Sequence, residues 1–153
     1  MMKKIGILIL IMIITYYISN HFCQLLLING QSMYPTYHNF QIVLILKYKR
    51  DYEINDVIAF KCDTLNSTLI KRIVGLPGDC IVIKEGILYV NNIPSTIMKN
   101  DTCIEYAGIA ETPIHLAADE YFVIGDNYSY SKDSRYAEIG AVKENAILGK
   151  IYP

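Results

Sequence analysis

The sequence has no strong excess of either charge, and this argues against nucleic acid as a partner. Its 14 basic and 15 acidic residues give a net charge of −1, and charged residues make up only 19% of the chain. Nucleic-acid-binding domains usually carry a clear excess of Lys and Arg. Internal repeats and low-complexity linkers are also lacking. The 153 residues are therefore expected to form one domain with at most one short additional segment.

The cysteines and histidines are too few and too scattered to indicate a metal site. The four cysteines lack the paired spacing of a zinc site, so neither a metal nor a cofactor is expected. Cys62, Cys80 and Cys103 follow the N-terminal segment and can form at most one disulfide, whose pairing the sequence leaves open. His38 or His115 could serve a Ser-His-Asp triad, but neither lies in a motif that positions an imidazole.

One long apolar run is present, and it lies at the N-terminus. Lys3 and Lys4 precede a mostly apolar stretch over residues 5–28. As a helix this stretch would be about 36 Å long, enough to span a bilayer. The alternative is a cleaved signal peptide, but no small-residue cleavage site follows the run. We expect an uncleaved single-pass anchor at residues 1–28, with the lysines and the N-terminus in the cytoplasm.

Residues 29–153, expected to lie outside the cytoplasm, show no long helical periodicity. Short apolar runs punctuated by turn residues predict strands in a mainly-β domain. The expected strands cover residues 41–47, 56–61, 68–74, 80–84, 87–90, 120–124 and 146–152. The expected fold is a single N-terminal transmembrane helix followed by a partly closed, antiparallel β-barrel-like domain. Weak patterning over residues 91–119 predicts a short, loop-rich insertion.

A serine follows the N-terminal run closely, in the segment SMYPT at residues 32–36. Pro35 keeps the residue before it out of the α region, so the segment is extended or turning. Gly30 allows the backbone to approach a ligand closely. Ser32 could therefore point its hydroxyl into a cleft, but it needs a neighbouring base to become a nucleophile. The alternative is an ordinary serine in a surface turn.

Lys71 is the candidate base, because it lies in the predicted strand 68–74 between apolar neighbours. An ordinary lysine has a pKa of ~10.4 and stays protonated at neutral pH. Burial among apolar groups can lower that pKa by up to ~3–5, which makes a neutral amine available. Arg72 should point to the opposite face of a regular strand. The alternative is a lysine that points to solvent.

These segments resemble the signature segments of bacterial type I signal peptidases. The resemblance extends to the strand at residues 55–60 and to the polar segments GDN at 125–127 and SKDSR at 131–135. The four blocks occur in the family's order and cover most of residues 30–135. The glycine at position 30 is typical of short members of the family, mostly from Gram-positive bacteria. The short interval 80–124 implies that the extra β domain of larger members is absent.

The resemblance implies a role for each matching residue. Ser32 would be the nucleophile and Lys71 the general base, with Ser131 hydrogen-bonded to the lysine amine and orienting it. Asp133 and Arg135 would form a structural ion pair beneath the site. The residues implied to contact substrate are Ile28, Gly30, Met33, Leu69 and Ile70. Shallow apolar pockets would admit small residues one and three positions before the cut.

Three positions depart from the commoner family pattern. Gly30 lacks the hydroxyl that other members use in the oxyanion hole, so backbone N–H groups, including that of Ser32, would have to serve. Tyr37 and Tyr128 stand where leucine and arginine are usual. These two tyrosines are expected to reshape the cleft and the packing of the polar loop.

The function expected from the resemblance is that of a membrane-bound serine endopeptidase that removes signal peptides from exported preproteins. Its partners would be signal peptides and the lipid bilayer, with export machinery left open. One alternative is a dedicated processing peptidase for a single substrate class. Another is a catalytically inactive membrane scaffold, against which the presence of both Ser32 and Lys71 argues. A self-cleaving phage-repressor-type enzyme is disfavoured by the N-terminal anchor.

Overall fold

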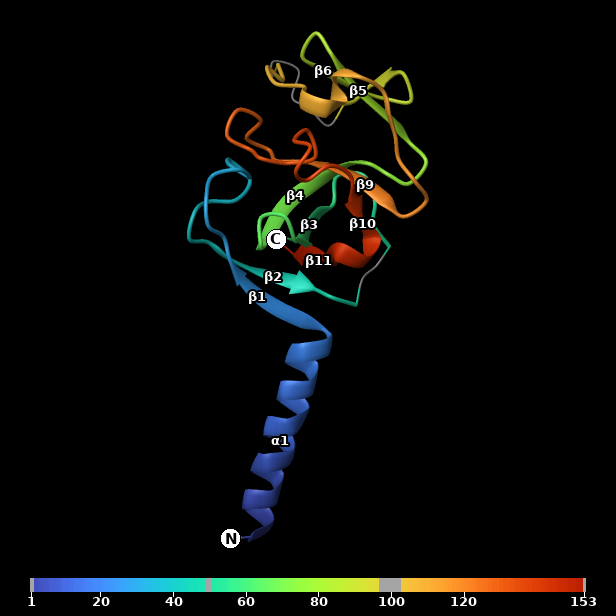
Figure 1. Cartoon of the computed structure of the whole chain (residues 1–153). Coiled ribbons are helices and arrows are strands. Elements are labelled where there is room, and N and C mark those ends of the chain that lie inside the picture. The colour runs from blue at the N-terminus through green and yellow to red at the C-terminus, as the bar shows by residue number, and fades with distance from the viewer. Residues whose placement is uncertain (1, 49–50, 97–102, 153) are drawn as a thin grey trace.

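A single helix leads into the β domain of this protein. The computed structural model describes residues 2–48, 51–96 and 103–152, and α1 (Met2–His21) projects from the rest of the chain as a separate rod (Figure 1). The large apolar side chains described from Ile5 to Ile18 are all exposed, because no other element covers them. Among the described residues, no helix reaches the length and apolarity that a membrane crossing requires.

The helix in the structure ends earlier than the helix expected over residues 5–28. The helix ends at His21, and β1 (Cys23–Leu27) pairs antiparallel with β2 (Ile42–Leu46), Leu27 lying opposite Ile42. Leu26 packs against a buried cluster that includes Ile28 and Val43. The apolar residues at the end of the run thus belong to the sheet, because burial against its core fixes them as a strand.

Seven of the described strands, β1 and β2 among them, form one antiparallel sheet, which confirms the predicted mainly-β fold. Its further strands are β3 (Val57–Cys62), β4 (Ser67–Gly75), β9 (Glu120–Ile124), β10 (Val142–Lys143) and β11 (Ile147–Tyr152), and the short helix η2 (Glu144–Ala146) links the last two. The strand order is β1-β2-β11-β3-β4-β9-β10. No pairing joins the outer strands β1 and β10 within the described part of the chain, so the sheet is not a closed barrel.

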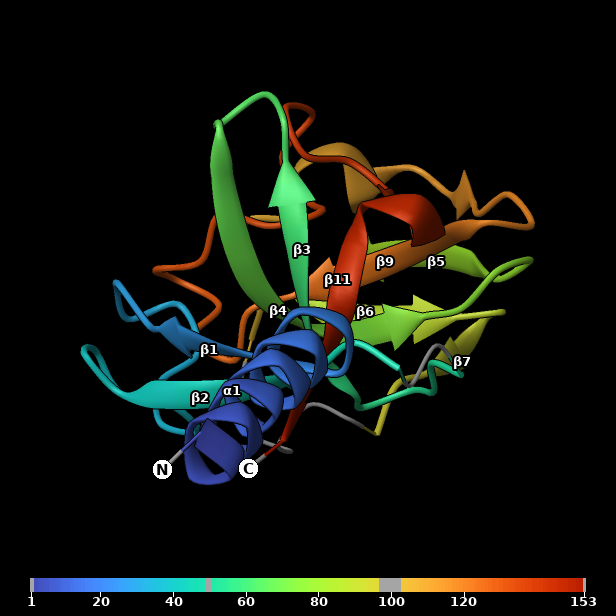
Figure 2. The same cartoon turned by 90° about the horizontal axis from the view of Figure 1, so that it is seen from below.

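A second, four-stranded sheet occupies the interval between β4 and β9. Its order is β7-β6-β5-β8, with bounds β5 (Cys80–Lys84), β6 (Ile87–Val90), β7 (Ile93–Pro94) and β8 (Ile114–His115). Two of these short strands and the helix η1 (Gly108–Glu111) lie in the region expected to be loop-rich. Residues 97–102 of that region lie outside the described residues. Figure 2 shows β5, β6 and β9 beyond α1 in a view from below.

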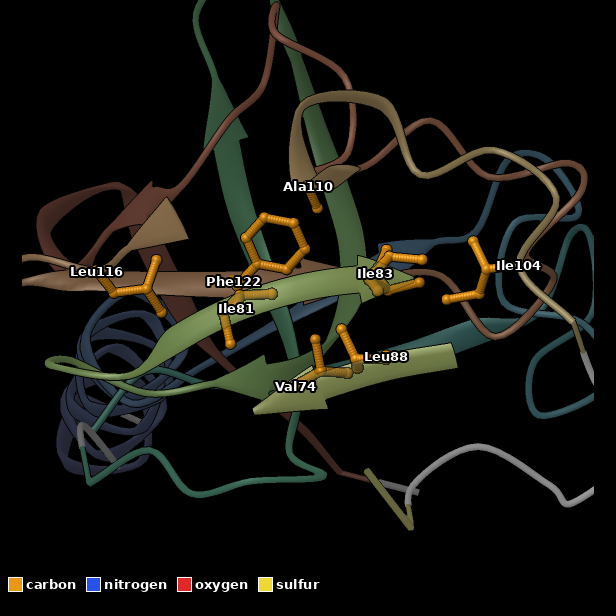
Figure 3. Packing of buried hydrophobic residues seen from close by; sticks show 9 residues of the cluster. Val74, Ile81, Ile83, Leu88, Ile104, Ala110, Leu116 and Phe122 are labelled. Atoms are coloured by element: carbon orange, nitrogen blue, oxygen red, sulfur yellow. The ribbon is translucent and has the colours of Figure 1, made fainter. Parts of the chain in front are cut away.

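A buried cluster joins the two sheets and fixes β4 and β9, the strands next to the predicted site residues. Figure 3 shows Val74 of β4 and Phe122 of β9 packed with apolar side chains of the second sheet and its loops. The other members of this cluster that the figure labels are Ile81, Ile83, Leu88, Ile104, Ala110 and Leu116. The cluster therefore fixes the position of β4, which carries Lys71, and of β9, which leads into residues 125–127.

A different cluster fixes the loop between β1 and β2. Met33 and Tyr37 are buried with Ile70 of β4 and Ile45 of β2. Met33, only 2% exposed, directly follows Ser32. Burial of this neighbour therefore holds the serine beside β4.

Candidate active site

The loop that carries Ser32 is held by hydrogen bonds on both sides of the serine. The Gly30 N–H donates to Asn39 Oδ1 at 2.8 Å, and the Tyr37 N–H donates to the Met33 carbonyl at 2.9 Å. Ser32 itself is only partly buried. Its hydroxyl is thus fixed in place while still reachable from solvent.

Asn127 ties this loop to the polar segment after β9. Its backbone N–H donates to the Ser32 carbonyl at 3.0 Å, and its side-chain Nδ2 donates to the Gln31 carbonyl at 3.1 Å. Gly125 permits this approach, since a Cβ there would lie 2.5 Å from the Ser32 carbonyl oxygen. The segment 125–127 therefore acts as a clamp on the backbone around the serine.

Lys71 reaches Ser32 from β4, where it lies opposite Ile58 of β3. The Lys71 side chain is buried, and its Nζ donates to Ser32 Oγ at 2.8 Å and to the Ile70 carbonyl at 2.9 Å. Burial lowers the pKa of Lys71 from its ordinary 10.5 to about 8, although the negative charges of Asp133 and Asp126 act in the opposite direction. A substantial fraction of the amine is therefore neutral in mildly alkaline solution.

Asp133 and Arg135 form a buried ion pair below the clamp, as the resemblance implied. The Arg135 Nε donates to Asp133 Oδ1 at 2.8 Å, and the Gly125 N–H donates to Asp133 Oδ2 at 3.0 Å. Arg135 also donates to the carbonyls of Tyr106, Tyr128 and Ser131. The pair thereby connects β9, the polar loop and the second sheet's loop in one network.

Sequence reasoning missed a second ion pair beside the dyad. Arg72 binds the Asp126 carboxylate through Nε and Nη2 at 2.7 and 2.6 Å, and the Thr36 hydroxyl donates to the same carboxylate. Arg72 and Thr36 follow Lys71 and Ser32 closely in the chain, so Asp126 joins the two segments that carry the dyad. Tyr37 and Tyr128 lie within electrostatic reach of this pair, and burial raises the pKa of both phenols. The sequence held no signal for the pairing beyond the polarity of residues 125–127.

The structure corrects one expectation for the polar loop. Ser131 is buried, but its hydroxyl has no hydrogen-bond partner among the described residues, and the expected bond to the Lys71 amine is absent. The lysine amine is directed instead to Ser32 Oγ and the Ile70 carbonyl. The hydroxyl of Ser134 does not reach the lysine either, because it accepts the Val123 N–H at 3.0 Å.

A small cleft opens at the dyad between the end of β1 and the first half of β4. It encloses about 100 Å³ and includes four of the five residues expected to contact substrate, Gly30 being the exception. The cleft is lined by Leu26, Leu27, Ile28, Asn29, Ser32, Met33, Thr68, Leu69, Ile70 and Lys71. Its apolar walls and small volume match the side chain of alanine better than that of a large residue.

The alternative residues lie elsewhere or lack the needed partners. The ring of His38 packs edge-on against Tyr34, and His115 lies on β8 beside Cys80. Neither imidazole bonds to Ser32 in the part of the chain that the structure describes. All four cysteines are free thiols.

The fold and the site define a mainly-β protein in which a buried lysine amine contacts a serine hydroxyl in an apolar cleft. The family model "Signal peptidase, peptidase S26" matches residues 1–152, so the chain belongs to the peptidase S26 family of signal peptidases.

Individual relatives agree with this assignment. The chain is 31% identical to signal peptidase I T of Bacillus subtilis over 133 residues, which cover 80% of this chain and 68% of that protein. It is 30% identical to signal peptidase I U of the same species, over 96% of this chain and 84% of that protein. A crystal structure of signal peptidase I from Enterococcus faecalis is similar with a TM-score of 0.52 and 26% identity, covering 67% of this chain and 97% of that one.

We predict that Asp133→Ala destabilises the fold. The substitution would leave the buried Arg135 charge without its carboxylate, which typically costs about 3–5 kcal/mol. Urea unfolding of the full chain measures this loss. Lys132→Ala is the matched control, because it removes the exposed ion pair with Glu138 and should barely change the unfolding midpoint. Equal effects of the two substitutions would contradict a structural role for the buried pair.

We predict that Lys71→Met stabilises the protein in a pH-dependent way. Below pH 8 the parent must bury a charged amine, and each unit of the pKa difference between 10.5 and about 8 corresponds to ~1.4 kcal/mol, so the variant should gain on the order of 3 kcal/mol at pH 6. Between pH 8 and 10.5 the unfolded parent binds more protons than the folded one, so the parent gains stability as pH rises and the difference narrows.

Unfolding of the parent and the Lys71→Met variant at pH 6, 8 and 10 checks this behaviour, with Lys61→Met at an exposed position of β3 as the control. A difference that stays constant with pH would show that the pKa of Lys71 is not lowered.

Proposed function

We propose that the chain is a serine endopeptidase that removes signal peptides from exported preproteins, with Ser32 as nucleophile and Lys71 as general base. The observation that carries the proposal is the 2.8 Å contact between the Ser32 hydroxyl and a lysine amine whose pKa lies at about 8. A neutral amine can take the hydroxyl proton, which a protonated one cannot. An inactive scaffold would not require this arrangement.

The reaction follows from this pair. Ser32 Oγ attacks the carbonyl carbon of the scissile peptide while its proton passes to Lys71 Nζ. The tetrahedral intermediate collapses to an acyl-serine ester, and the lysine returns the proton to the leaving amine. Water then attacks the ester carbon while its proton passes to Lys71. The bond from that carbon to Ser32 Oγ breaks, Lys71 returns the proton to Ser32 Oγ, and the signal peptide leaves with a free carboxylate.

The cleft can bind an extended peptide along its walls. Residues 67–72 of β4 pair with β3, and pairing with β9 begins only at Arg72. The cleft side of residues 68–71 thus lacks a strand partner among the described residues, and β1 is an edge strand. A substrate strand could bond to backbone groups along this unpaired side of β4. The apolar walls would then select small residues near the cut.

The clamp and the Arg72–Asp126 pair would keep the dyad aligned. Asp126 binds both Arg72 and Thr36, so it links the residue after the base to the loop of the nucleophile. Correct positioning of reacting groups contributes strongly to rate. We therefore assign this pair and Asn127 to positioning, and the Asp133–Arg135 pair to support of the loop beneath.

The exposed apolar surface supports a location at the cell membrane. The register places Leu27 beside Ile42, and Leu25 beside Leu44 and then Tyr152, on the outer face of β1, β2 and β11. These side chains are exposed or only half-buried, next to an apolar α1. A contiguous apolar face of this kind is typical of a membrane contact. We propose that α1 anchors the enzyme with its N-terminus in the cytoplasm and the β domain outside.

We predict that Ser32→Ala and Lys71→Ala each abolish cleavage of a preprotein by the full chain in detergent. For the parent, kcat/KM should rise about tenfold per pH unit below pH 8 and level off above it, because only the neutral amine accepts the serine proton. Circular dichroism would show that both variants fold. Substantial cleavage by either folded variant, or a flat pH profile, would rule out the dyad.

We predict that protease added to wall-stripped cells digests the segment 29–153, because the N-terminal lysines favour a cytoplasmic N-terminus. Immunoblotting of the full chain before and after cell lysis measures this accessibility, with a cytoplasmic protein as the control. Digestion that occurs only after lysis would mean that the domain lies inside, where it could not meet exported substrates.

A further inference from the structure

The proposed reaction needs a hydrogen-bond donor that position 30 does not supply. In acyl transfer the substrate carbonyl oxygen gains negative charge, and donors aimed at that oxygen are a major source of catalysis. The Ser32 N–H has no acceptor among the described residues and is one candidate. Gly30 cannot add a second donor from a side chain, and its φ of 112° disfavours any other residue there.

The cleft is also lined by an exposed residue whose side chain has the right chemistry. Besides Ser32 and Lys71, the polar cleft residues are Asn29 and Thr68. The amide of Asn29 carries two N–H donors, and no hydrogen bond occupies it within the described part of the chain. Thr68 lies three residues from Lys71 on an extended strand, about 10 Å away. Asn29 is only three residues from the nucleophile, on the short segment that closes the same cleft.

The backbone on both sides of Asn29 is pinned. The Ile28 N–H donates to the Gln41 carbonyl at 2.8 Å, and the Ile28 carbonyl accepts the Phe40 N–H at 2.8 Å. On the other side, the Gly30 N–H donates to Asn39 Oδ1 at 2.8 Å. The fixed backbone limits the positions that the Asn29 amide can reach, so only the side-chain rotamer has to be selected when the amide donates.

We infer that Asn29 is a further catalytic residue, whose side-chain amide donates a hydrogen bond to the oxyanion together with the Ser32 N–H. This inference rests on the proposed peptidase function. As the Ser32 Oγ–carbon bond forms, the carbonyl π electrons move to oxygen and the hydroxyl proton moves to Lys71. Asn29 donates without transferring a proton and releases the oxygen when the carbonyl re-forms.

The test compares Asn29→Ala and the near-isosteric Asn29→Asp with the parent, as full chains in detergent. The substrate is a preprotein peptide with alanine one and three positions before the cut. Asn145→Ala is the matched control, since Asn145 is exposed on η2 and far along the chain from the cleft. We expect kcat to fall about 10²- to 10³-fold in both Asn29 variants, with KM and thermal stability nearly unchanged.

A peptide aldehyde gives a second measurement that a structural role would not affect. The aldehyde carbon adds to Ser32 Oγ as a hemiacetal, whose oxygen occupies the oxyanion position. Its affinity for the Asn29 variants should fall by the same factor as kcat, while affinity for the cleaved signal peptide should not change.

The outcomes separate the two claims. If the parent cleaves the peptide and Asn29→Ala keeps its kcat, or raises only KM, the role of Asn29 is wrong and the peptidase assignment stands. If the parent does not cleave at all, the proposed function fails and the role of Asn29 fails with it. A loss of kcat in Asn145→Ala as large as in Asn29→Ala would also overturn the inference.

Discussion

The site depends on burying the amine of one lysine away from water while keeping the net negative charge around it small. Lys71 is buried and held against Ser32 Oγ, and this desolvation is the largest influence on its pKa. The negative charges of Asp126 and Asp133, acting alone, would raise the pKa of Lys71 again and keep its amine protonated. Each is bonded directly to an arginine, Arg72 or Arg135, so much of its field is cancelled nearby. The lysine can therefore act as a base near neutral pH because burial outweighs what remains of the carboxylates' field.

The same two ion pairs also carry the architecture of the site. One joins the loop of Ser32 to the strand of Lys71 through Asp126, and the other holds the polar loop beneath Gly125. Apolar packing completes the frame, with Met33 buried between the sheet strands and Val74 and Phe122 joining the second sheet to the first. Alignment of the nucleophile and the base is thus spread over contacts that a single surface substitution would not remove.

Much of this could be predicted from the sequence, and the exceptions have physical causes. The predicted strands are found with nearly the expected bounds, because alternating apolar residues and turn signals are local features. The N-terminal apolar run predicts a helix over the residues that form β1 in the structure. Leucine is common in both helices and strands, and only the pairing with β2 decides between the two. The Arg72–Asp126 pair joins residues 54 positions apart, which no local pattern records. The expectation for Ser131 rests on resemblance alone, and the direction of a lysine side chain is set by the contacts that surround it.

A glycine at position 30 changes how the cleft can be completed. With φ at 112° and no atom of any residue beyond its two chain neighbours within 4 Å of the point where a Cβ would lie, the constraint at Gly30 is backbone conformation and not space. A side-chain donor at position 30 would strain the very loop that Met33 and Asn127 hold in place. Moving the donor by one residue, to Asn29, avoids that strain, because the backbone at this position is not left-handed and hydrogen bonds fix it on both sides. The left-handed backbone at Gly30 thus accounts both for the missing hydroxyl at position 30 and for the rigid segment that carries Asn29.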